Sequence, residues 1–552
     1  MIETLRHALR HYQEVYLDGL GKYWAKQEVI IKFRGHFYRF EQFNEVIQIE
    51  ERVNWLNITS EPVDDQYDLI LHHYYEPSIR ADGFQLKIEK QSEIIIKTSN
   101  LRGFRYAFDA LKQLFIQHDT GIELVNAEVN HEPSFEMRGV IEGFYGVPWV
   151  QADRIDLLHY LGKHRMNTYM YAPKDDELQR KRWREHYGAD KLAEFTELLD
   201  VAEAEQIAFY YMISPGNDID YTQTDEVAVL TGKLQTIIDL GVRHFGLLLD
   251  DIDYILKDNA KKRFKNAASA HAYLIRKVDD FLAATLSDYT LVVCPTEYDN
   301  ALGSEYLDHL TQAVPQHIPF FWTGPSTLAR SITTEAIAQM SAVYQRPMVI
   351  WDNTPVNDYQ ADHELLLLSP YENRSANLAD PRYQVMGIVS NPMAQWELSK
   401  LTVGHMGHYL WNSSGFNFMA DWHETLEELA GTDLVEALKT FADYNPNRHT
   451  REVFTQRQLA AIQAKNVAYI SQCVTELTAA ANQLRGLEDE RLRSQLLPWL
   501  ERAEADANFW QTILTGDTLA IAKHKAELVG SAHRIGRDLP MAYVNAHQLD
   551  KE

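Results

Sequence analysis

Short apolar runs alternate with longer amphipathic segments in the middle of the 552-residue chain. The apolar runs span residues 138–144, 167–173, 207–214, 244–251, 289–295, 319–324, 347–353 and 385–391. Apolar residues recur at helical spacing in the intervening segments at 151–164, 190–206, 225–241 and 267–286. Eight buried strands that alternate with helices predict a (β/α)8 barrel of the α/β class. An open doubly wound sheet is the alternative, but no glycine-rich phosphate fingerprint follows the first run.

The segment before the barrel mixes strand and helix patterns. Strands are predicted at residues 27–34, 67–75 and 83–99, where apolar and polar residues partly alternate. An amphipathic helix is predicted over residues 100–118, and residues 126–135 are interpreted as a connector. Together these patterns predict a small N-terminal α+β domain over residues 1–132.

Helical spacing dominates the chain after about residue 420. Apolar residues recur at this spacing in segments 421–444, 455–487, 491–514 and 517–536. Their Trp and Leu stripes are typical of a buried core rather than of a second ligand site. We therefore predict a TIM-barrel catalytic domain over residues 133–415 and a C-terminal helical bundle over residues 416–552.

The net charge and the cysteine content limit the kinds of partner and site that we expect. The chain has 53 Lys and Arg against 79 Asp and Glu, a formal net charge of −26. Nucleic acids and anionic membranes are bound through basic patches, so neither is expected as a partner, and an acidic polysaccharide is disfavoured. The two cysteines form neither a disulfide framework nor a zinc cluster. Because we see no signal peptide and no membrane-spanning run, we expect a cytoplasmic protein.

The stretch "FGLLLDDIDY" at residues 245–254 ends an apolar run with Asp250, Asp251 and Asp253. The carboxyl ends of barrel strands converge on one face, where active sites are built. Polar or aromatic residues end the other runs as well, namely Glu142, Tyr145, Lys174, Asp175, Asp176, Glu297, Tyr298, Trp322, Thr323, Trp351, Asp352, Asn353 and Asn391. Loop capping accounts for one Asp or Thr at a strand end, but not for so many converging carboxylates, amides and aromatics.

Two chemical interpretations of the aspartates compete. A D-x-D pair formed by Asp251 and Asp253 could bind a divalent metal in a sugar transferase, but no phosphate-binding loop accompanies it. Adjacent carboxylates at 250 and 251 could instead reach different atoms of one substrate, and their like charges would raise the pKa of one of them. Glycoside hydrolysis fits this second interpretation. Aromatic residues that could stack on a sugar are Tyr145, Tyr298, Trp322, Trp351 and Tyr359.

Seven short motifs lie between about residues 137 and 405. They are "RGVIEGFYGVPW", "MNTYMYAPKDDELQRKRWREHY", "LLLDDID", "CPTEY", "FWTGP", "VIWDNTPVNDY" and "VSNPMAQWELSK". Together and in this order they resemble glycoside hydrolase family 84. That family contains β-N-acetylglucosaminidases often called O-GlcNAcases, and bacterial members have also been labelled hyaluronidases. The flanking domains resemble the layout of its bacterial members.

The resemblance implies catalysis assisted by the substrate's own 2-acetamido group, through an oxazoline intermediate and with retention of configuration. Asp250 would hold the acetamido N–H and stabilise the charge that develops on that group. Asp251 would protonate the leaving oxygen and then act as base on the attacking water. Tyr298 would donate a hydrogen bond to the acetamido oxygen, with Asn353 nearby.

The resemblance also assigns residues that shape the sugar pocket. Trp351 and Tyr145 would wall the space for the acetyl group. Gly143 and Lys174 would contact sugar hydroxyls, since a glycine allows close approach of the backbone.

The remaining contacts complete the predicted site. Asp358 would bind the 4- and 6-hydroxyls, Asn391 would add a further hydroxyl contact, and Asp253 would support the loop without reacting. The predicted function is a retaining exo-β-N-acetylglucosaminidase acting on a GlcNAc-bearing glycoconjugate or glycoprotein, with no cofactor and no metal. The alternatives are a hyaluronidase-type or other glycan-directed hexosaminidase of the same fold, and a metal-dependent sugar transferase or hydrolase that uses the D-x-D pair.

Overall fold

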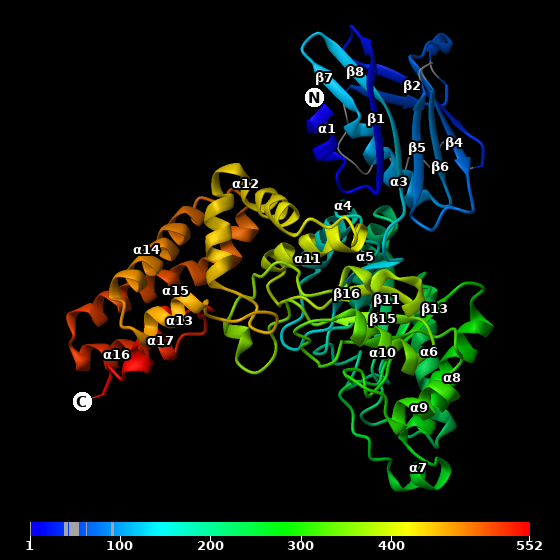
Figure 1. Ribbon diagram of the computed structural model, residues 1–552. Helices are drawn as coiled ribbons and strands as arrows, with labels where there is room; N and C mark the ends of the chain where they lie inside the picture. Colours follow the sequence, from blue (N-terminus) through cyan, green and yellow to red (C-terminus); the bar gives the residue numbers. More distant parts are fainter. Residues whose placement is uncertain (1, 38–41, 43–54, 62, 90–92, 552) are drawn as a thin grey trace.

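The computed structural model describes residues 2–37, 42, 55–61, 63–89 and 93–551. Figure 1 shows three groups of elements: a mixed sheet near the N-terminus, a central barrel, and a set of helices toward the C-terminus. Each group has its own buried hydrophobic cluster. On these separate cores we propose the division into domains at residues 1–132, 133–415 and 416–552.

The central part is a closed barrel of eight parallel strands. The strands are β9 (Met137–Glu142), β10 (Thr168–Tyr171), β11 (Ala208–Ile213), β12 (His244–Leu248), β13 (Thr290–Cys294), β14 (Phe320–Trp322), β15 (Met348–Asp352) and β16 (Val385–Ser390). Strand β16 pairs with β9, which closes the barrel. Each predicted apolar run overlaps one of these strands, so the predicted (β/α)8 barrel is confirmed and the open sheet is wrong.

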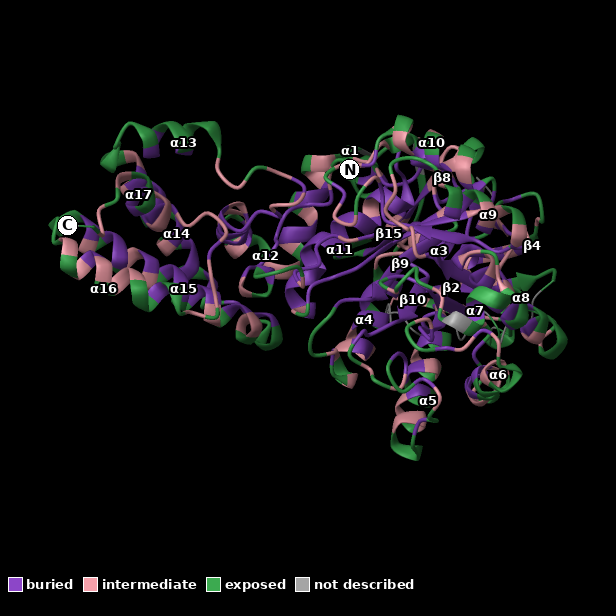
Figure 2. Cartoon of the chain, turned by 90° about the horizontal axis from the view of Figure 1, so that it is seen from below, coloured by how far each residue is buried: buried purple, intermediate pink, exposed green. Residues whose placement is uncertain are grey.

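Helices surround the barrel and bury its outer surface. They are α4 (Gln151–Lys163), α5 (Ala189–Ala204), α6 (Thr224–Asp239), α7 (Asp258–Arg263), α8 (Ala267–Thr285), α9 (Glu305–Ala313), α10 (Thr334–Tyr344) and α11 (Trp396–Trp411). Figure 2 shows buried residues in the strands and exposed residues along the outer helices. In β12 and just after it, Phe245, Leu247 and Leu249 pack toward the helices, whereas Leu248 packs inside the barrel. This alternation predicts that residue 250 points into the barrel mouth.

The elements described in the N-terminal domain are an eight-stranded sheet and its accompanying helices. They are α1 (Ile2–Ala8), β1 (Glu14–Trp24), β2 (Val29–Gly35), β3 (Leu56–Thr59), β4 (Leu69–Tyr75), β5 (Phe84–Glu89), β6 (Glu93–Thr98), α3 (Leu101–Gln113), β7 (Phe115–His118) and β8 (Gly121–His131). The strand predicted over 83–99 is a hairpin of β5 and β6, and its residues 90–92 lie outside the described residues.

Two predictions for this domain are wrong. The helix expected to reach residue 118 ends at Gln113, because β7 pairs with β8. Most of the expected connector at 126–135 belongs to β8, which pairs with β1 and β5. The interpretation as a connector overlooked the period-two alternation that buries Ala127, Val129 and His131.

The C-terminal part is helical, as predicted. Its helices are α12 (Phe418–Tyr444), α13 (Gln456–Gln463), α14 (Val467–Leu484), α15 (Glu490–Thr515), α16 (Thr518–Val529) and α17 (Leu539–His547). The single segment predicted over 455–487 is two helices, separated at Lys465, which has a positive φ of 52°. Among the described residues, no helix combines the length and apolar character that crossing a membrane requires.

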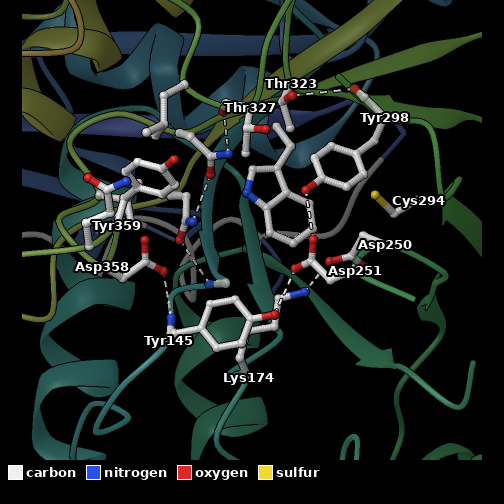
Figure 3. A pocket seen from close by; sticks show the side chains of 17 residues that line it. Tyr145, Lys174, Asp250, Asp251, Cys294, Tyr298, Thr323, Thr327, Asp358 and Tyr359 are labelled. Carbon is white, nitrogen blue, oxygen red and sulfur yellow. Dashed lines mark hydrogen bonds and ion pairs between the residues drawn. The ribbon is translucent and has the colours of Figure 1, made fainter. Parts of the chain in front are cut away.

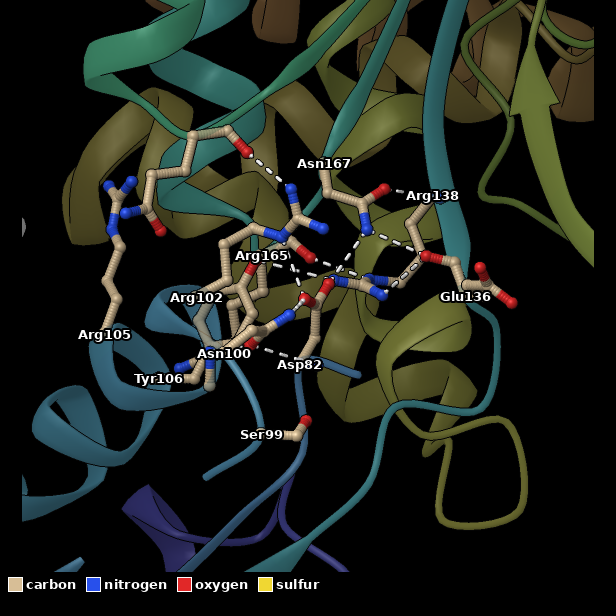
Figure 4. A network of polar contacts seen from close by, with 12 residues as sticks. Asp82, Ser99, Asn100, Arg102, Arg105, Tyr106, Glu136, Arg138, Arg165 and Asn167 are labelled. Carbon is tan, nitrogen blue, oxygen red and sulfur yellow. Dashed lines mark hydrogen bonds and ion pairs between the residues drawn. The ribbon is translucent and has the colours of Figure 1, made fainter. Parts of the chain in front are cut away.

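A buried carboxylate links the N-terminal domain to the barrel (Figure 4). Asp82 is 1% exposed and accepts hydrogen bonds from Asn100 and Arg102 of its own domain, at 2.8 Å each. It also accepts hydrogen bonds from Arg138 and Asn167 of the barrel, at 2.9 Å each. Burial alone would raise the pKa of Asp82, but the two arginines outweigh burial and lower it. The stabilisation is therefore present at neutral pH and is lost only as the pH falls below the ordinary Asp range.

Replacing this carboxylate should weaken the junction between the two domains. Asp82→Asn leaves the buried Arg138 and the partly buried Arg102 without their counter-ion, which costs about 3–5 kcal/mol for a buried ion pair. We expect a lower melting temperature by circular dichroism, and the exposed Asp119→Asn serves as the control. An Asp82→Asn melting temperature equal to that of the control would show that the junction does not depend on this charge.

Candidate active site

A pocket of about 350 Å³ opens at the carboxyl ends of the barrel strands (Figure 3). It is lined by Gly143, Tyr145, Lys174, Asp250, Asp251, Cys294, Tyr298, Thr323, Thr327, Leu328, Trp351, Asn353, Val356, Asp358, Tyr359, Gln360 and Asn391. All ten predicted site residues are in this set. The volume lies at the small end of the range for ligand sites and suits a single sugar ring.

Asp250 is a buried carboxylate with one occupied and one open oxygen. Its Oδ2 forms an ion pair with the ammonium group of Lys174, and both side chains are buried. Its Oδ1 is buried and has no hydrogen-bond partner among the described residues. A buried acceptor without a donor is unfavourable, so this oxygen is ready to accept a hydrogen bond from a ligand.

Asp251 follows in the left-handed region, with φ of 52°, and its carboxylate accepts two phenol hydrogen bonds. Tyr145 donates to Oδ2 at 2.8 Å and Tyr298 donates to Oδ1 at 2.9 Å. Partial burial raises the pKa of Asp251, but the charge of Lys174 and the two phenols outweigh burial and lower it. From the sequence we expect the like charges of the two carboxylates to raise the pKa of one of them. The pKa of Asp251 is instead lowered, because Lys174 and the hydroxyls of Tyr145 and Tyr298 lie close to its carboxylate, which the sequence pattern does not reveal.

Arg180 is a functional neighbour that the sequence analysis missed. Its guanidinium donates to the Tyr145 hydroxyl at 2.7 Å and to the backbone oxygen of Asp251 at 3.4 Å. It therefore orients the phenol that contacts the Asp251 carboxylate. The only available signal was its place within the motif "APKDDELQR", six residues after Lys174.

A chain of amide hydrogen bonds forms the opposite wall. The Asn353 side chain donates to the Thr327 carbonyl at 2.8 Å, and Asn391 donates to the Asn353 oxygen at 2.9 Å. The backbone N–H of Gly143 donates to the Asn391 oxygen at 3.1 Å. A Cβ atom on Gly143 would lie 2.3 Å from the Trp351 ring, so the glycine makes room for this tryptophan.

Asp358 closes the pocket on a third side. Its carboxylate accepts the backbone N–H of Tyr145 at 2.7 Å. Burial raises its pKa, and the Tyr145 hydrogen bond and Lys174 only partly offset this. The pocket thus combines carboxylates, one buried ammonium group and aromatic walls, a set that can hold a polar ring and transfer protons to and from it.

The profile of a family described as beta-N-acetylglucosaminidase matches residues 138–443. The chain belongs to this family, glycoside hydrolase family 84. The protein O-GlcNAcases of mouse and rat are each 36% identical over 285 residues, which are 50% of this chain and 30% of each relative. The aligned part therefore spans less than a third of the length of these curated relatives.

Solved structures of family 84 proteins have similar folds. A variant of the O-GlcNAc hydrolase of Thermobaculum terrenum superposes with a TM-score of 0.68 and 27% identity, over 76% of this chain and 95% of that chain. CpGH84B superposes with a TM-score of 0.79 over 98% of this chain and 99% of that chain. At 23% identity, the second comparison supports the fold alone.

Two expectations from the sequence are wrong within this family 84 site: the stacking role of Trp322 and the D-x-D clamp. Trp322 is fully buried between strands and helices, and its indole donates to the Asn300 carbonyl at 3.0 Å, so it cannot stack on a ligand. Asp253 does not line the pocket; it accepts the backbone N–H of Ile255 at 2.9 Å and supports the loop, as expected. The D-x-D clamp of Asp251 and Asp253 is therefore not formed.

Other lining residues lacked a chemical signal in the sequence. Cys294 is apolar in character and ends its strand inside the barrel, so it resembles a core residue. The others missed are Thr327, Leu328, Val356 and Gln360, which lie on loops after β14 and β15. Loop conformation brings them to the pocket, and hydrophobic periodicity does not report loop conformation.

Because Gly143 lies against the Trp351 ring, adding one methyl group at residue 143 should strongly lower activity. Gly143→Ala must displace the Trp351 ring, and a misplacement of this order near the chemistry lowers kcat/KM by about 100-fold. The measurement is hydrolysis of an aryl β-GlcNAc. Gly188→Ala is the matched control, because a Cβ there meets nothing within 4 Å. Equal kcat/KM for the two variants would contradict this account of the wall.

Proposed function

We propose that the protein is a retaining exo-β-N-acetylglucosaminidase that removes terminal β-linked GlcNAc with the help of the substrate's acetamido group. The observation that carries the proposal is the open, buried oxygen of Asp250 beside the hydrogen-bonded carboxylate of Asp251. An unpaired buried acceptor fits an amide N–H. A neighbouring carboxylate that already accepts two hydroxyl hydrogen bonds fits a glycosidic oxygen or a water.

In the first step, the acetamido oxygen attacks C1 while the glycosidic bond breaks. Asp250 accepts the acetamido N–H and stabilises the positive charge that develops on the group as the oxazoline forms. Lys174, paired with the other oxygen of Asp250, fixes the position of that carboxylate. The electron pair of the broken bond goes to the leaving oxygen, which takes the proton of Asp251.

The lowered pKa of Asp251 favours the ionised carboxylate in the ligand-free site, whereas the first step requires the protonated acid. We propose that the Tyr298 hydroxyl turns from Asp251 to the acetamido oxygen when the sugar binds. Asp251 then loses one of the two phenol donors that favour its ionised form, so its pKa rises as the leaving oxygen arrives. The movement of the Tyr298 hydroxyl thus couples substrate binding to protonation of Asp251.

In the second step, water attacks C1 and the oxazoline opens. Asp251, now a carboxylate, takes the proton of that water, and the product keeps the β configuration. We assign Tyr145 and Trp351 to the walls of the acetyl space, with Asn353 near the acetamido group. The ring hydroxyls are assigned to Gly143, Lys174, Asp358 and Asn391, with Asp358 on the 4- and 6-hydroxyls.

The proposed aglycone is a protein Ser or Thr, as the name of the mouse and rat relatives suggests. The net charge of −26 disfavours hyaluronan, whose glucuronate would be repelled. Exposed aromatic rings at the pocket rim, Tyr145 and Tyr359, offer apolar surface to the group that carries the sugar.

Substrate assistance predicts that the rate follows the basicity of the acetamido oxygen. Aryl β-GlcNAc substrates with mono-, di- and trifluoroacetyl groups should react progressively more slowly, because fluorine withdraws electrons from the attacking oxygen. The measurement is kcat/KM across the series, with the same aryl leaving group throughout. A rate indifferent to fluorination would rule out the acetamido nucleophile.

The two aspartates should respond differently to the leaving group. Asp251→Asn removes the acid, so loss should be about 100- to 10,000-fold with a poor leaving group and much smaller with dinitrophenol. Asp250→Asn removes charge stabilisation, so loss should be about 100- to 1,000-fold with every leaving group. The measurement is kcat/KM against leaving-group pKa. Parallel lines for both variants would contradict this division of roles.

A further inference from the structure

A second cluster of ligating side chains lies away from the pocket, where the three groups of elements meet. We propose that His11, His408, Asp421 and Glu424 form a binding site for one divalent transition-metal ion of the Zn²⁺ type. One ligand atom from each of the four residues lies within 4.8 Å of the other three. No other such group of three or more His, Cys, Asp or Glu side chains occurs among the described residues.

The four residues come from three separate segments. His11 lies between α1 and β1, and its backbone oxygen accepts a hydrogen bond from Asn412 at 3.3 Å. His408 is in the last turn of α11, which follows the final barrel strand. Asp421 and Glu424 are three residues apart at the start of α12, so both face the same side of that helix. Helix α12 leads from the barrel to the C-terminal helices (Figure 1).

The donor set suits a borderline metal ion. Two imidazoles and two carboxylates can bind Zn²⁺ at about 2.0–2.2 Å, which places neighbouring ligand atoms about 3.4 Å apart in a tetrahedron. His11 Nε2 lies 3.1 Å from Glu424, and its Nδ1 lies 3.8 Å from Asp421. Closing the cluster onto an ion therefore requires side-chain shifts of about 1 Å.

His408 is available to act as a ligand. Its ring lies 4.5 Å from the His11 ring, and neither of its nitrogens has a hydrogen-bond partner among the described residues. One ring nitrogen of His408 also lies within 4.8 Å of a ligand atom of each of the other three residues. His408 can therefore reach an ion held by His11, Asp421 and Glu424.

Arg10 is the group that competes with a metal ion. Its guanidinium lies 3.4 Å from Asp421 and makes a closer contact with Glu424, so it serves as their counter-ion when no metal is present. Its Nε is buried and has no partner among the described residues, so the arrangement leaves one donor unsatisfied. The same side chain also donates to the His7 carbonyl at 3.2 Å, a contact that does not involve the cluster.

The other nearby charges do not occupy the cluster. Arg165 packs against the rings of Tyr12 and Trp411, and His164 bonds to Glu428 at 3.2 Å. With Arg10 turned away, the two carboxylates balance the charge of a divalent ion. The ion would then join the N-terminal segment to α11 and α12, a structural role outside the pocket.

Direct measurement of bound metal tests the site. We expect the 552-residue chain to retain about one Zn²⁺ per chain after equilibrium dialysis against micromolar Zn²⁺, and to melt at a higher temperature with Zn²⁺ than in chelator. Co²⁺ in its place should give the visible absorption of a four-coordinate site. Activity on an aryl β-GlcNAc should not change, because none of the four ligands lines the pocket.

Three variants at the site and one control elsewhere separate specific binding from nonspecific uptake. Glu424→Gln and His408→Gln should each weaken Zn²⁺ binding at least 10- to 100-fold, the range found for loss of even an outer-shell partner. Arg10→Gln should instead tighten binding about tenfold, because it removes the competing charge. The exposed His186→Asn should bind like the unchanged protein.

If a ligand variant fails to fold, Arg10→Gln still tests the proposal. Misfolding cannot increase the affinity for Zn²⁺, so tighter binding by this variant would reflect the site itself. Less than about half an equivalent of Zn²⁺ in the unchanged protein, or no tightening in Arg10→Gln, would overturn the proposal. Equal affinity of Glu424→Gln, His408→Gln and His186→Asn would overturn it as well.

Discussion

Closure of the parallel barrel is the constraint on which the rest of the structure depends. The pairing of β16 with β9 brings the ends of strands that lie more than two hundred residues apart to one rim. Gly139 and Gly387 show how tight the closure is, since a Cβ on either would lie 1.8 Å from a backbone oxygen of the adjacent strand. The hydrogen bond from Gly143 to Asn391, which completes the pocket wall, exists only because these first and last strands meet.

Within that rim, one buried ammonium group organises the charges. Lys174 pairs with Asp250 and also acts on Asp251 through its field, so two adjacent carboxylates share one cation. The strand alternation turns Asp250 inward, and the left-handed backbone at Asp251 turns the next carboxylate toward Tyr145 and Tyr298. Adjacent residues thereby acquire different partners, and different partners are what allow two identical side chains to play two roles.

The parts of the fold that sequence alone predicts are those with a strong local period. The eight barrel strands and their helices are continuous apolar or amphipathic segments, and the motif residues at strand ends follow from the barrel geometry. The rest depends on contacts that no local pattern encodes. Strand β8 resembles a connector in sequence because Asn126, Glu128 and Asn130 stand between its buried residues. Arg180 acts through its contacts with Tyr145 and the backbone of Asp251, which no local pattern reports. His11 and His408 are separated by almost four hundred positions, so their proximity has no signature in the chain.

Contacts that stabilise the fold and residues of the pocket lie at opposite ends of the barrel. Asp82 binds Arg138 at the start of β9 and Asn167 just before β10, which is the amino-terminal end of the barrel. The pocket lies at the opposite, carboxyl-terminal end. The contacts at the first end hold the N-terminal domain in place, whereas loops at the second end carry the reacting groups. Because the buried ion pairs around Asp82 do not contact the pocket residues, weakening them should lower the fraction of folded protein without altering how each folded molecule binds or cleaves its substrate.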